Sequence, residues 1–265
     1  MHRSKPLNYK GNQLPTAAPL SAVIITRDAA SQLRWCLESV AFADEIVVVD
    51  SGSSDGTVDL ARAHGARVIQ HEWLGFGRQK QYAVSQATHD WVLCLDADER
   101  VSDELRASIV VELAHSRGFV YAVPRCNRFL GRWLRHGEGY PDWNTRLFHR
   151  AHARWSDDPV HEHVVTNEQI SRLAGDLLHD SAETLERYFD KQNRYTTLQA
   201  ERLAREGATA SGARLVLSPI ARFLKFYVFR LGFLDGVAGL VHISIGCVAS
   251  FMKYAKLIAL RRAAR

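Results

Sequence analysis

The chain has 265 residues, 46% of them hydrophobic, and a formal net charge of +5. This length fits one large α/β domain, or such a domain with an appendage, and the apolar content is ample for a core. The four cysteines are scattered without paired spacing, which argues against a disulfide framework or a zinc site and favours reduced thiols in a cytosolic chain. Residues 1–20 are basic but contain no apolar run, so we expect a tail there and no signal peptide.

Predicted strands and helices alternate over the first half of the chain. Apolar runs bounded by polar residues predict buried strands at 22–26, 45–49, 67–72, 91–95 and 119–123. Helical apolar spacing and helix start and stop signals occur in the segments that follow the first four of these strands. This alternation predicts βαβ units and a mostly parallel sheet flanked by helices.

The alternation stops after residue 125. Residues 125–159 are rich in Arg, Trp, Gly and His, with one short predicted strand at 145–149, and long irregular segments of this kind are often functional. A charged helix is predicted over 182–205, followed by a linker of small residues. We therefore expect a tail at 1–20, an α/β domain at 21–205 and a separate C-terminal segment at 206–265.

The C-terminal segment is basic and apolar. Between residues 213 and 265 there are nine Lys or Arg residues and one acidic residue. The basic residues alternate with apolar runs, which favours an anionic membrane surface over nucleic acid as the partner. No apolar run reaches the ~20 uninterrupted residues of a spanning helix. We expect helices that lie in the membrane interface, peripheral or monotopic, with helices docked on the sheet as the alternative.

Aspartates follow three of the predicted strands. Asp28 follows the first, Asp50 the second, and Asp96 and Asp98 the fourth. The carboxyl ends of parallel strands meet at one sheet edge, where open α/β sheets bind ligands. Each acid alone could be a turn former. Together they predict a site for a nucleoside and for a divalent cation that also takes phosphate oxygens.

Three segments in this order are similar to motifs of a known family. They are residues 23–28 (VIITRD), 47–57 (VVVDSGSSDGT) and 95–99 (LDADE). Their order and spacing resemble family-2 glycosyltransferases with the GT-A fold, over about residues 20–180. The chain looks closest to the branch that adds glucose in β-1,4 linkage to heptose of the lipopolysaccharide inner core. The segments behind that narrower resemblance are 140–143, 146–148, 160–162 and 232–236.

The resemblance implies an inverting transfer from a nucleotide sugar, with UDP-glucose as the expected donor. It also implies a divalent metal, Mg²⁺ or Mn²⁺, and a lipid-linked saccharide acceptor at the cytoplasmic face of the bacterial inner membrane. The expected donor-binding residues are Thr26, Arg27, Asp28, Asp50, Ser51, Arg78, Lys80, Asp96 and Asp98. Many relatives have two adjacent acids after the second strand, whereas this chain has Asp50-Ser51, so which position meets the base stays open.

An inverting transfer needs a base, because the acceptor hydroxyl loses its proton as it attacks. The candidates are Glu162, Asp157 and Asp158, of which we favour Glu162. In a strand, Glu162 would point away from the two histidines beside it. A zinc site built from His161, His163, His149 and His152 is therefore a minor alternative. We expect Asp98 and Asp96 to hold the metal, with His179 as a further ligand or as a structural residue.

Arginines and aromatic residues are interleaved in the irregular segment. Aromatic faces stack on sugar rings, and arginines pair with phosphate or carboxylate, which suits an acidic saccharide acceptor. The expected acceptor-binding residues are Arg125, Arg128, Trp133, Tyr140, Asp142, Trp143 and Arg146. A solvated loop with packed aromatics is the alternative.

Other functions remain open at this point. Another donor sugar, such as galactose or an N-acetylhexosamine, or a lipid-phosphate acceptor would use the same motifs. A sugar nucleotidyltransferase would have a glycine-rich loop after the first strand, and residues 27–30 contain no glycine. A non-catalytic, membrane-bound scaffold is the third possibility, which nucleotide binding would distinguish. The oligomeric state is unknown.

Overall fold

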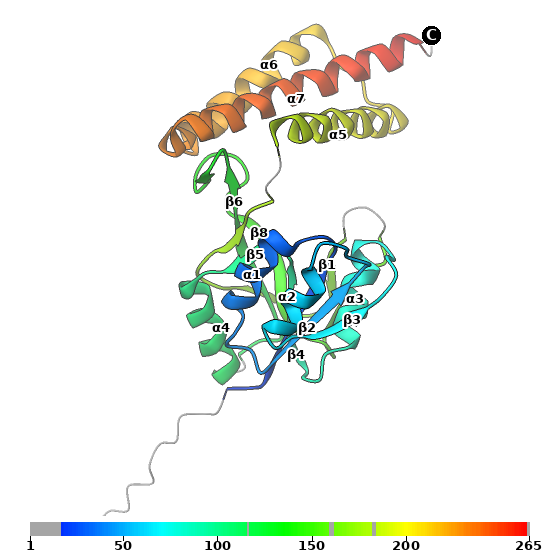
Figure 1. The fold of residues 1–265 in the computed structure, drawn as a ribbon. Helices are drawn as coiled ribbons and strands as arrows, with labels where there is room; N and C mark the ends of the chain where they lie inside the picture. The colour runs from blue at the N-terminus through cyan, green and yellow to red at the C-terminus, as the bar shows by residue number, and fades with distance from the viewer. Residues whose placement is uncertain (1–16, 116, 159–161, 182–183, 264–265) are drawn as a thin grey trace, which may run out of the picture.

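The computed structural model describes residues 17–115, 117–158, 162–181 and 184–263 (Figure 1). An α/β domain comes first, and three long helices form a layer beside it (Figure 1). The first sixteen residues, and with them most of the expected tail, lie outside the described residues.

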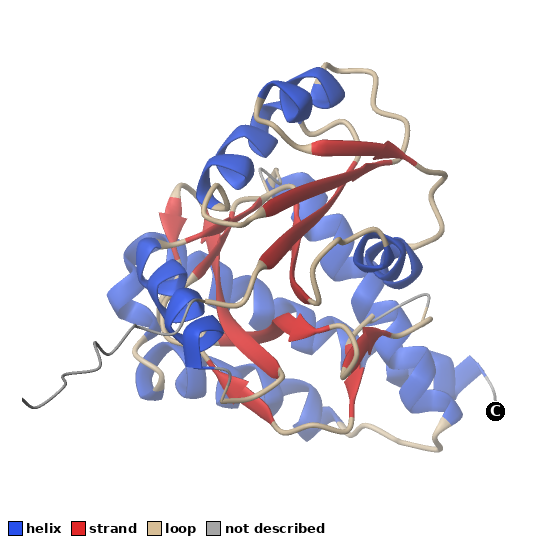
Figure 2. Cartoon of the chain, turned by 90° about the horizontal axis from the view of Figure 1, so that it is seen from below, coloured by secondary structure: helices blue, strands red, loops and turns tan. Residues whose placement is uncertain are grey.

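A ten-stranded mixed sheet forms the centre of the α/β domain (Figure 2). Its main path runs β3-β2-β1-β4-β8-β6-β12-β5, and β7 and β11 also pair with β6. The first four strands are parallel, whereas β8 is antiparallel to both of its neighbours. The strands of this sheet are β1 (Leu20–Thr26), β2 (Glu45–Asp50), β3 (Arg67–Gln70), β4 (Trp91–Asp96), β5 (Glu99–Val101), β6 (Val120–Phe129), β7 (Arg132–Trp133), β8 (Asp142–His149), β11 (Ile170–Arg172) and β12 (Leu177–His179). A separate pair consists of β9 (Ala153–Trp155) and β10 (Val164–Thr166).

Helices cover both faces of the sheet, which explains why its central strands are continuous apolar runs. In β1, Ala22 and Ile24 belong to one buried cluster, together with residues of α1, α2 and α4. Val23 and Ile25 belong to the other cluster, which includes residues of α3. The helices are α1 (Ala30–Ser39), α2 (Thr57–Ala63), α3 (Phe76–Ser85) and α4 (Asp103–His115).

The strand register confirms that the acidic strand ends share one edge. Thr26 at the end of β1 pairs with Asp50 at the end of β2. On the other side of β1, Ile25 pairs with Asp96 at the end of β4. The side chains that the sequence predicts at this edge therefore come from neighbouring strands.

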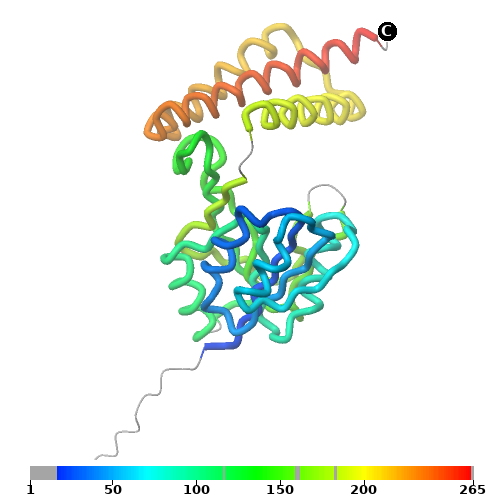
Figure 3. Tube along the Cα trace, in the orientation of Figure 1, coloured from blue at the N-terminus to red at the C-terminus, as the bar shows by residue number. Residues whose placement is uncertain are grey.

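The C-terminal layer contains α5 (Leu185–Arg205), α6 (Gly212–Phe223) and α7 (Gly236–Ala263), as the trace in Figure 3 shows. A π-helical turn, η1 (Leu224–Phe229), and a 3₁₀ turn, η2 (Gly232–Asp235), join α6 to α7. The expected domain boundary at 205 is wrong, because α5 packs against α7 and buries Ala200 with Tyr254 and Leu257. The helical unit therefore begins at residue 185.

One helix in the described chain, Gly232–Ala263 with its 3₁₀ turn, is long and apolar enough to cross a membrane. The sequence predicts shorter apolar runs because His242 and glycines interrupt them. In the structure His242 lines a cavity and Gly239 packs against Gly232, so both interruptions lie on packed sides of a continuous helix.

Hydrogen bonds and a close backbone contact attach the helical layer to the α/β domain. Asp235 is 2% exposed and accepts hydrogen bonds from the backbone N–H groups of His136 (2.8 Å) and Arg135 (3.3 Å). Gly137 N–H donates to the carbonyl of Arg230 at 2.8 Å. A Cβ added at Gly232 would lie 2.7 Å from the backbone carbonyl oxygen of Phe226, so only glycine permits this approach. The 232–236 segment thus attaches the helices to the loop before β8.

Candidate active site

Asp96, at the end of β4, lies within a network of buried charges. Lys80 of α3 places its Nζ 3.1 Å from Asp96 Oδ1 and donates a hydrogen bond to Oδ2 at 3.2 Å. Arg146 of β8 donates to the same Oδ2 at 3.2 Å. Within the described residues Asp96 Oδ1 accepts no hydrogen bond of good geometry, although it lies in ion-pair contact with Lys80. Both carboxylate oxygens of Asp96 therefore face the ammonium group of Lys80.

Glu99 supports Asp96 from behind. It is 1% exposed, accepts a hydrogen bond from the Asp96 N–H at 3.1 Å, and pairs with Arg146 at 2.7 Å. Burial acts to raise the pKa of Asp96, but the charges of Lys80 and Arg146 outweigh it and lower that pKa. Burial opposes the charge of Arg146, yet Glu99 and Asp96 raise its pKa. Asp96 is therefore held ionised and fixed in orientation.

Asp98 and His179 face each other beside this network. His179 Nε2 lies 3.2 Å from Asp98 Oδ2, and its Nδ1 lies 2.7 Å from Asn127 Oδ1. Because an amide oxygen only accepts, this contact places a proton on Nδ1, and Nε2 is the nitrogen that faces Asp98. A ring nitrogen and a carboxylate oxygen 3.2 Å apart are held together by a proton or a cation between them. The pair therefore fits a divalent metal ion, with Asn127 orienting the histidine.

No group of three or more His, Cys, Asp or Glu side chains gathers as a metal cage in the part of the chain that the structure describes. Mg²⁺ is commonly bound by one or two carboxylates and takes its other ligands from water and substrate phosphates. A site of few protein ligands therefore suits a cation that arrives with a diphosphate. His161 of the alternative zinc set lies outside the described residues.

Asp28 and Asp50 both accept hydrogen bonds from the turn that follows β2. Asp50 is fully buried, and its carboxylate accepts hydrogen bonds from the N–H groups of Gly52 and Ser53, each at 3.0 Å. Asp28 is exposed and accepts from the Ser54 N–H at 2.8 Å. The expectation that Asp50 touches the donor is corrected here, because its oxygens already satisfy this turn. Asp28 remains at the surface of the edge.

Three further expected donor residues lie around the same edge. Thr26 is 6% exposed, and its hydroxyl has no hydrogen-bond partner in the described chain. Ser51 accepts a hydrogen bond from Gln79 at 3.0 Å. Arg27 is exposed and lies 3.9 Å from Asp28. An unsatisfied buried hydroxyl costs about 1–3 kcal/mol, so Thr26 is poised to bond with a ligand.

Lys80 contacts both Asp96 and Glu162, the favoured candidate for the base. Its Nζ lies 3.1 Å from Glu162 Oε1 as well as from Asp96, and the residue is 4% exposed. The expectation that Lys80 serves the phosphates is therefore revised to a bridging position between two carboxylates. Glu162 lies in the loop before β10 and not in a strand, so the argument from strand alternation does not apply to it.

The other two candidate bases are on the surface. Asp157 is 69% exposed and lies 3.9 Å from Arg78, which is itself 64% exposed. Asp158 is 55% exposed and lies 3.5 Å from His163. Neither has the buried charged neighbour that Glu162 has, so Glu162 is the best placed of the three.

The expected acceptor residues separate into two groups. Arg146 is 4% exposed beneath Asp96, so its expected contact with the acceptor is corrected to a role in positioning Asp96. The others lie nearer the surface, on or near β6, β7 and β8. Their contacts are Arg125 with Asp142 (2.8 Å), Arg128 with Asp180 (2.7 Å) and over Trp133 (5.8 Å), Trp143 under Arg172 (4.5 Å), and Tyr140 donating to Asp176 (2.7 Å).

Two residues at the site carry roles that sequence reasoning missed. Glu99 follows directly after the Asp-x-Asp pair, and Asn127 lies in the irregular segment just beyond the predicted strand at 119–123. The sequence did show Glu99 as a third acid next to the pair, but its burial and its contact with Arg146 appear only in the structure. No sequence signal links Asn127 to His179, because β12 pairs with β6 through long-range contacts.

A family model described as glycosyl transferase family 2 matches residues 21–174. The chain belongs to glycosyltransferase family 2. This confirms the expected family and the expected class of enzyme, a nucleotide-sugar glycosyltransferase. The mixed, mostly parallel sheet with flanking helices likewise agrees with the expected GT-A-like architecture.

Relatives of this glycosyltransferase match it over nearly its whole length. The lipopolysaccharide core biosynthesis glycosyltransferase LpsC of Rhizobium meliloti is 32% identical over 248 residues, covering 90% of this chain and 92% of LpsC. An uncharacterized glycosyltransferase of Rickettsia prowazekii, RP128, is 32% identical over 251 residues, covering 90% and 86%. The solved structure of S. aureus TarS residues 1–349 with UDP-GlcNAc has a TM-score of 0.49 at 15% identity, covering 93% and 92%.

Proposed function

We propose that this glycosyltransferase moves a hexose, with inversion, from a nucleotide sugar to an inner-core sugar of lipopolysaccharide or lipooligosaccharide. UDP-glucose is the proposed donor and heptose the proposed acceptor. The observation that carries the chemistry is the Asp98–His179 pair, 3.2 Å apart, beside Asp96 at the end of β4. The similarity to LpsC, named for lipopolysaccharide core biosynthesis, supports the choice of acceptor.

Asp98 and His179 would hold a Mg²⁺ or Mn²⁺ ion, and Asp96 would lie beside it. When bound, the cation neutralises charge on the leaving diphosphate. Asn127 keeps His179 Nε2 directed at Asp98. Thr26 and Asp28 would contact the nucleoside at the same sheet edge.

Glu162 would act as the base that takes the proton of the acceptor hydroxyl. Lys80 orients Glu162 and Asp96 together through its two contacts of 3.1 Å. The acid on the donor side, Asp96, and the proposed base, Glu162, therefore share the buried ammonium group of Lys80. An attacking hydroxyl, positioned near Glu162, would displace the diphosphate in a single step.

We also propose that the helical layer lies on the cytoplasmic face of the inner membrane, as a peripheral or monotopic element. Exposed apolar side chains are concentrated on α6, η1, η2 and α7, including Leu217 (61%), Phe229 (79%) and Val237 (74%). Basic residues accompany them, among them Lys225 and Arg230. Such a face binds lipid through apolar burial and through attraction to anionic headgroups.

Point variants can test membrane binding without removing the helices. Replacing Leu217, Ile220 and Phe229 with Gln should release the protein from vesicles that contain anionic lipid, while circular dichroism stays unchanged. The control replaces Val110 and Val111 of α4, which are 42% and 47% exposed, and should leave binding intact. Equal vesicle binding by both variants would show that the C-terminal face does not dock on lipid.

A donor screen tests the proposed reaction. The enzyme, with Mn²⁺ and a deacylated heptose-containing inner-core oligosaccharide, should consume UDP-glucose in preference to UDP-galactose and UDP-N-acetylglucosamine. Mass spectrometry of the acceptor should show one added hexose, and NMR its anomeric configuration. A preference for another sugar nucleotide would replace the donor assignment, and retention of configuration would refute the single displacement.

A further inference from the structure

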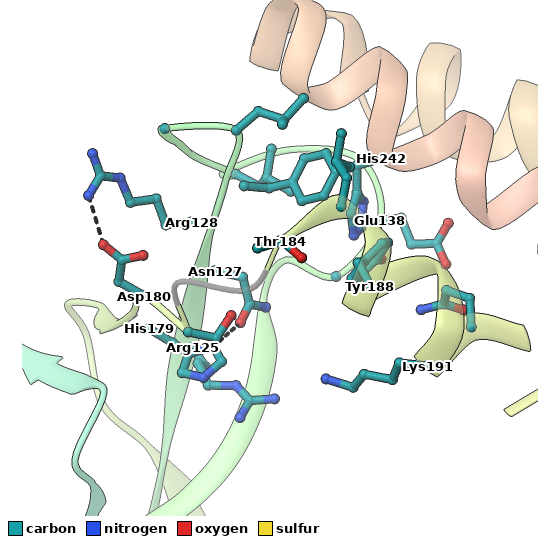
Figure 4. Close-up of a pocket in the computed structure, with 18 residues that line it drawn as sticks. Arg125, Asn127, Arg128, Glu138, His179, Asp180, Thr184, Tyr188, Lys191 and His242 are labelled. Carbon is teal, nitrogen blue, oxygen red and sulfur yellow. Dashed lines mark hydrogen bonds and ion pairs between the residues drawn. The ribbon is translucent and has the colours of Figure 1, made fainter. Parts of the chain in front are cut away.

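A cavity of about 560 Å³ lies between the α/β domain and the helical layer (Figure 4). Small-molecule sites commonly have volumes of about 300–1,000 Å³. Arg125, Asn127 and Arg128 of β6 form one side, and Tyr188 of α5 and His242 of α7 contribute to the other. His179 also lines the cavity, so the space reaches the proposed metal ligand. The sequence did not predict that α5 and α7 border the active site.

Three aromatic rings from three different elements meet at this cavity. The ring of Phe129 on β6 lies 5.4 Å from that of Tyr188 and 5.3 Å from that of His242. The rings of Tyr188 and His242 are 6.0 Å apart. Aromatic rings combine a large apolar face with polar edges, which suits a sugar ring that has an apolar face and hydroxyls at its rim.

The charge of the lining favours an anionic ligand. Three Lys or Arg residues and two Asp or Glu residues line the cavity. One of these acids, Glu138, is paired with Arg222, which lies outside the lining. The other, Asp180, is paired with Arg128 across the wall shown in Figure 4. Arg125 is in turn paired with Asp142. The lining and these partners together contain four basic and three acidic side chains, and this net positive charge would attract phosphate or carboxylate groups.

The cavity is held open by the junction between its two walls. Asp235, the last residue of η2, accepts a hydrogen bond from the loop that precedes β8, and Arg132 of β7 donates to the carbonyl of Leu234 at 2.9 Å. These bonds fix α7 against the same hairpin that supplies Phe129. The walls therefore come from separate parts of the chain and are joined by direct hydrogen bonds.

We propose that this cavity binds the saccharide part of the acceptor, an oligosaccharide with phosphate or carboxylate groups, and that α5 and α7 complete the acceptor site. The inference rests on the proposed function, because it takes the nearby Asp98–His179 pair to mark the diphosphate of the donor. The helical layer then has two roles, since it carries the exposed apolar face and also supplies sugar-binding side chains. An acceptor anchored in lipid would present its saccharide at the cavity.

Direct binding tests the cavity independently of catalysis. Isothermal titration with a phosphorylated, deacylated inner-core oligosaccharide should give a Kd about tenfold weaker for Tyr188→Leu and for His242→Leu than for the wild type. The matched control is Phe189→Leu, because Phe189 is the next residue of α5, is 48% exposed and does not line the cavity. Its Kd should stay within twofold of the wild type. Unchanged affinity in both cavity variants, or no binding to the wild type, would overturn the proposal.

Two further arms define the ligand chemistry and separate this inference from the proposed reaction. Maltotriose, a neutral saccharide, should bind at least tenfold more weakly, and equal binding would refute the anionic specificity. Dephosphorylating the oligosaccharide shows whether phosphate or carboxylate is the recognised group. The wild-type enzyme should also hydrolyse UDP-glucose slowly when no acceptor is present. If no nucleotide sugar is hydrolysed but Tyr188-dependent binding persists, the proposed reaction fails and the saccharide site stands.

Discussion

The buried pair of Arg146 and Glu99 gives a prediction whose size follows from the structure. The side chains are 5% and 0% exposed, and the distance between their charged groups is 2.7 Å. Replacing Arg146 with Met leaves the Glu99 carboxylate buried, with Arg125 at 3.8 Å as the remaining cation beside it in the described part of the chain. Removing one partner of a buried ion pair typically costs about 3–5 kcal/mol. Since 1 kcal/mol shifts the melting temperature of a chain of this size by roughly 2–4 °C, we expect Tm to fall by roughly 10 °C.

The double variant distinguishes this reasoning from a general packing defect. Arg146→Met combined with Glu99→Gln removes both charges, so it should recover a large part of the lost free energy of unfolding. Transfer activity should stay low in the double variant, because Asp96 still lacks its support from β8. Urea and thermal unfolding measure the first effect, and a transfer assay measures the second.

A surface pair provides the control. Arg202 and Glu206 form an exposed i,i+4 pair on α5, and Arg202→Met should leave the unfolding midpoint unchanged. The account would be refuted if Arg146→Met were as stable as the wild type. It would also be refuted if the Glu99 substitution worsened the defect instead of relieving it.

Three more predictions follow from the site. Asn127→Leu removes the acceptor that orients His179, so the Mn²⁺ concentration for half-maximal activity should rise about 10–100-fold, and an unchanged value would contradict the metal geometry. Lys80→Met separates Glu162 from Asp96 and should lower kcat by about 100-fold with partial rescue by Arg, whereas full activity would exclude the bridging role. Because the pKa of Asp96 is lowered from its ordinary 3.8, its ion pairs stabilise the fold above that value and stop doing so as pH falls through the lowered pKa. At acid pH, the free energy of unfolding should therefore depend less on pH in Asp96→Asn than in the wild type. The same pH dependence in both proteins would refute the contribution of Asp96.

The parallel half of the fold could be predicted because its signals are local. Each of β1, β2 and β4 is a single apolar run that ends at an acid or two residues before it, and a parallel arrangement alone brings those ends together. Hence the shared edge with Thr26 and Asp96 followed from the sequence. What the acids do there did not follow, since Asp50 turned out to be buried in a local turn that backbone donors complete.

The second half resisted prediction because its short strands pair over long distances. β9 to β12 have three residues each, which is too short to show an apolar periodicity in the sequence. Arg146 was expected to face the acceptor because it lies among exposed aromatics in sequence, but β8 inserts between β4 and β6 and turns it toward Asp96. Helix α5 was assigned to the α/β domain because its charged sequence does not reveal that it packs on α7.

The most direct test of the central claim is metal-dependent transfer by Asp98→Asn. The enzyme should transfer hexose from UDP-glucose to the inner-core oligosaccharide with Mn²⁺, and EDTA should abolish this. Asp98→Asn should lose at least 100-fold in kcat with an unchanged melting temperature, whereas Asp59→Asn, at an 89% exposed position on α2, should retain full activity. Full, EDTA-resistant transfer by Asp98→Asn would contradict the assignment of Asp98 and His179 as the metal site.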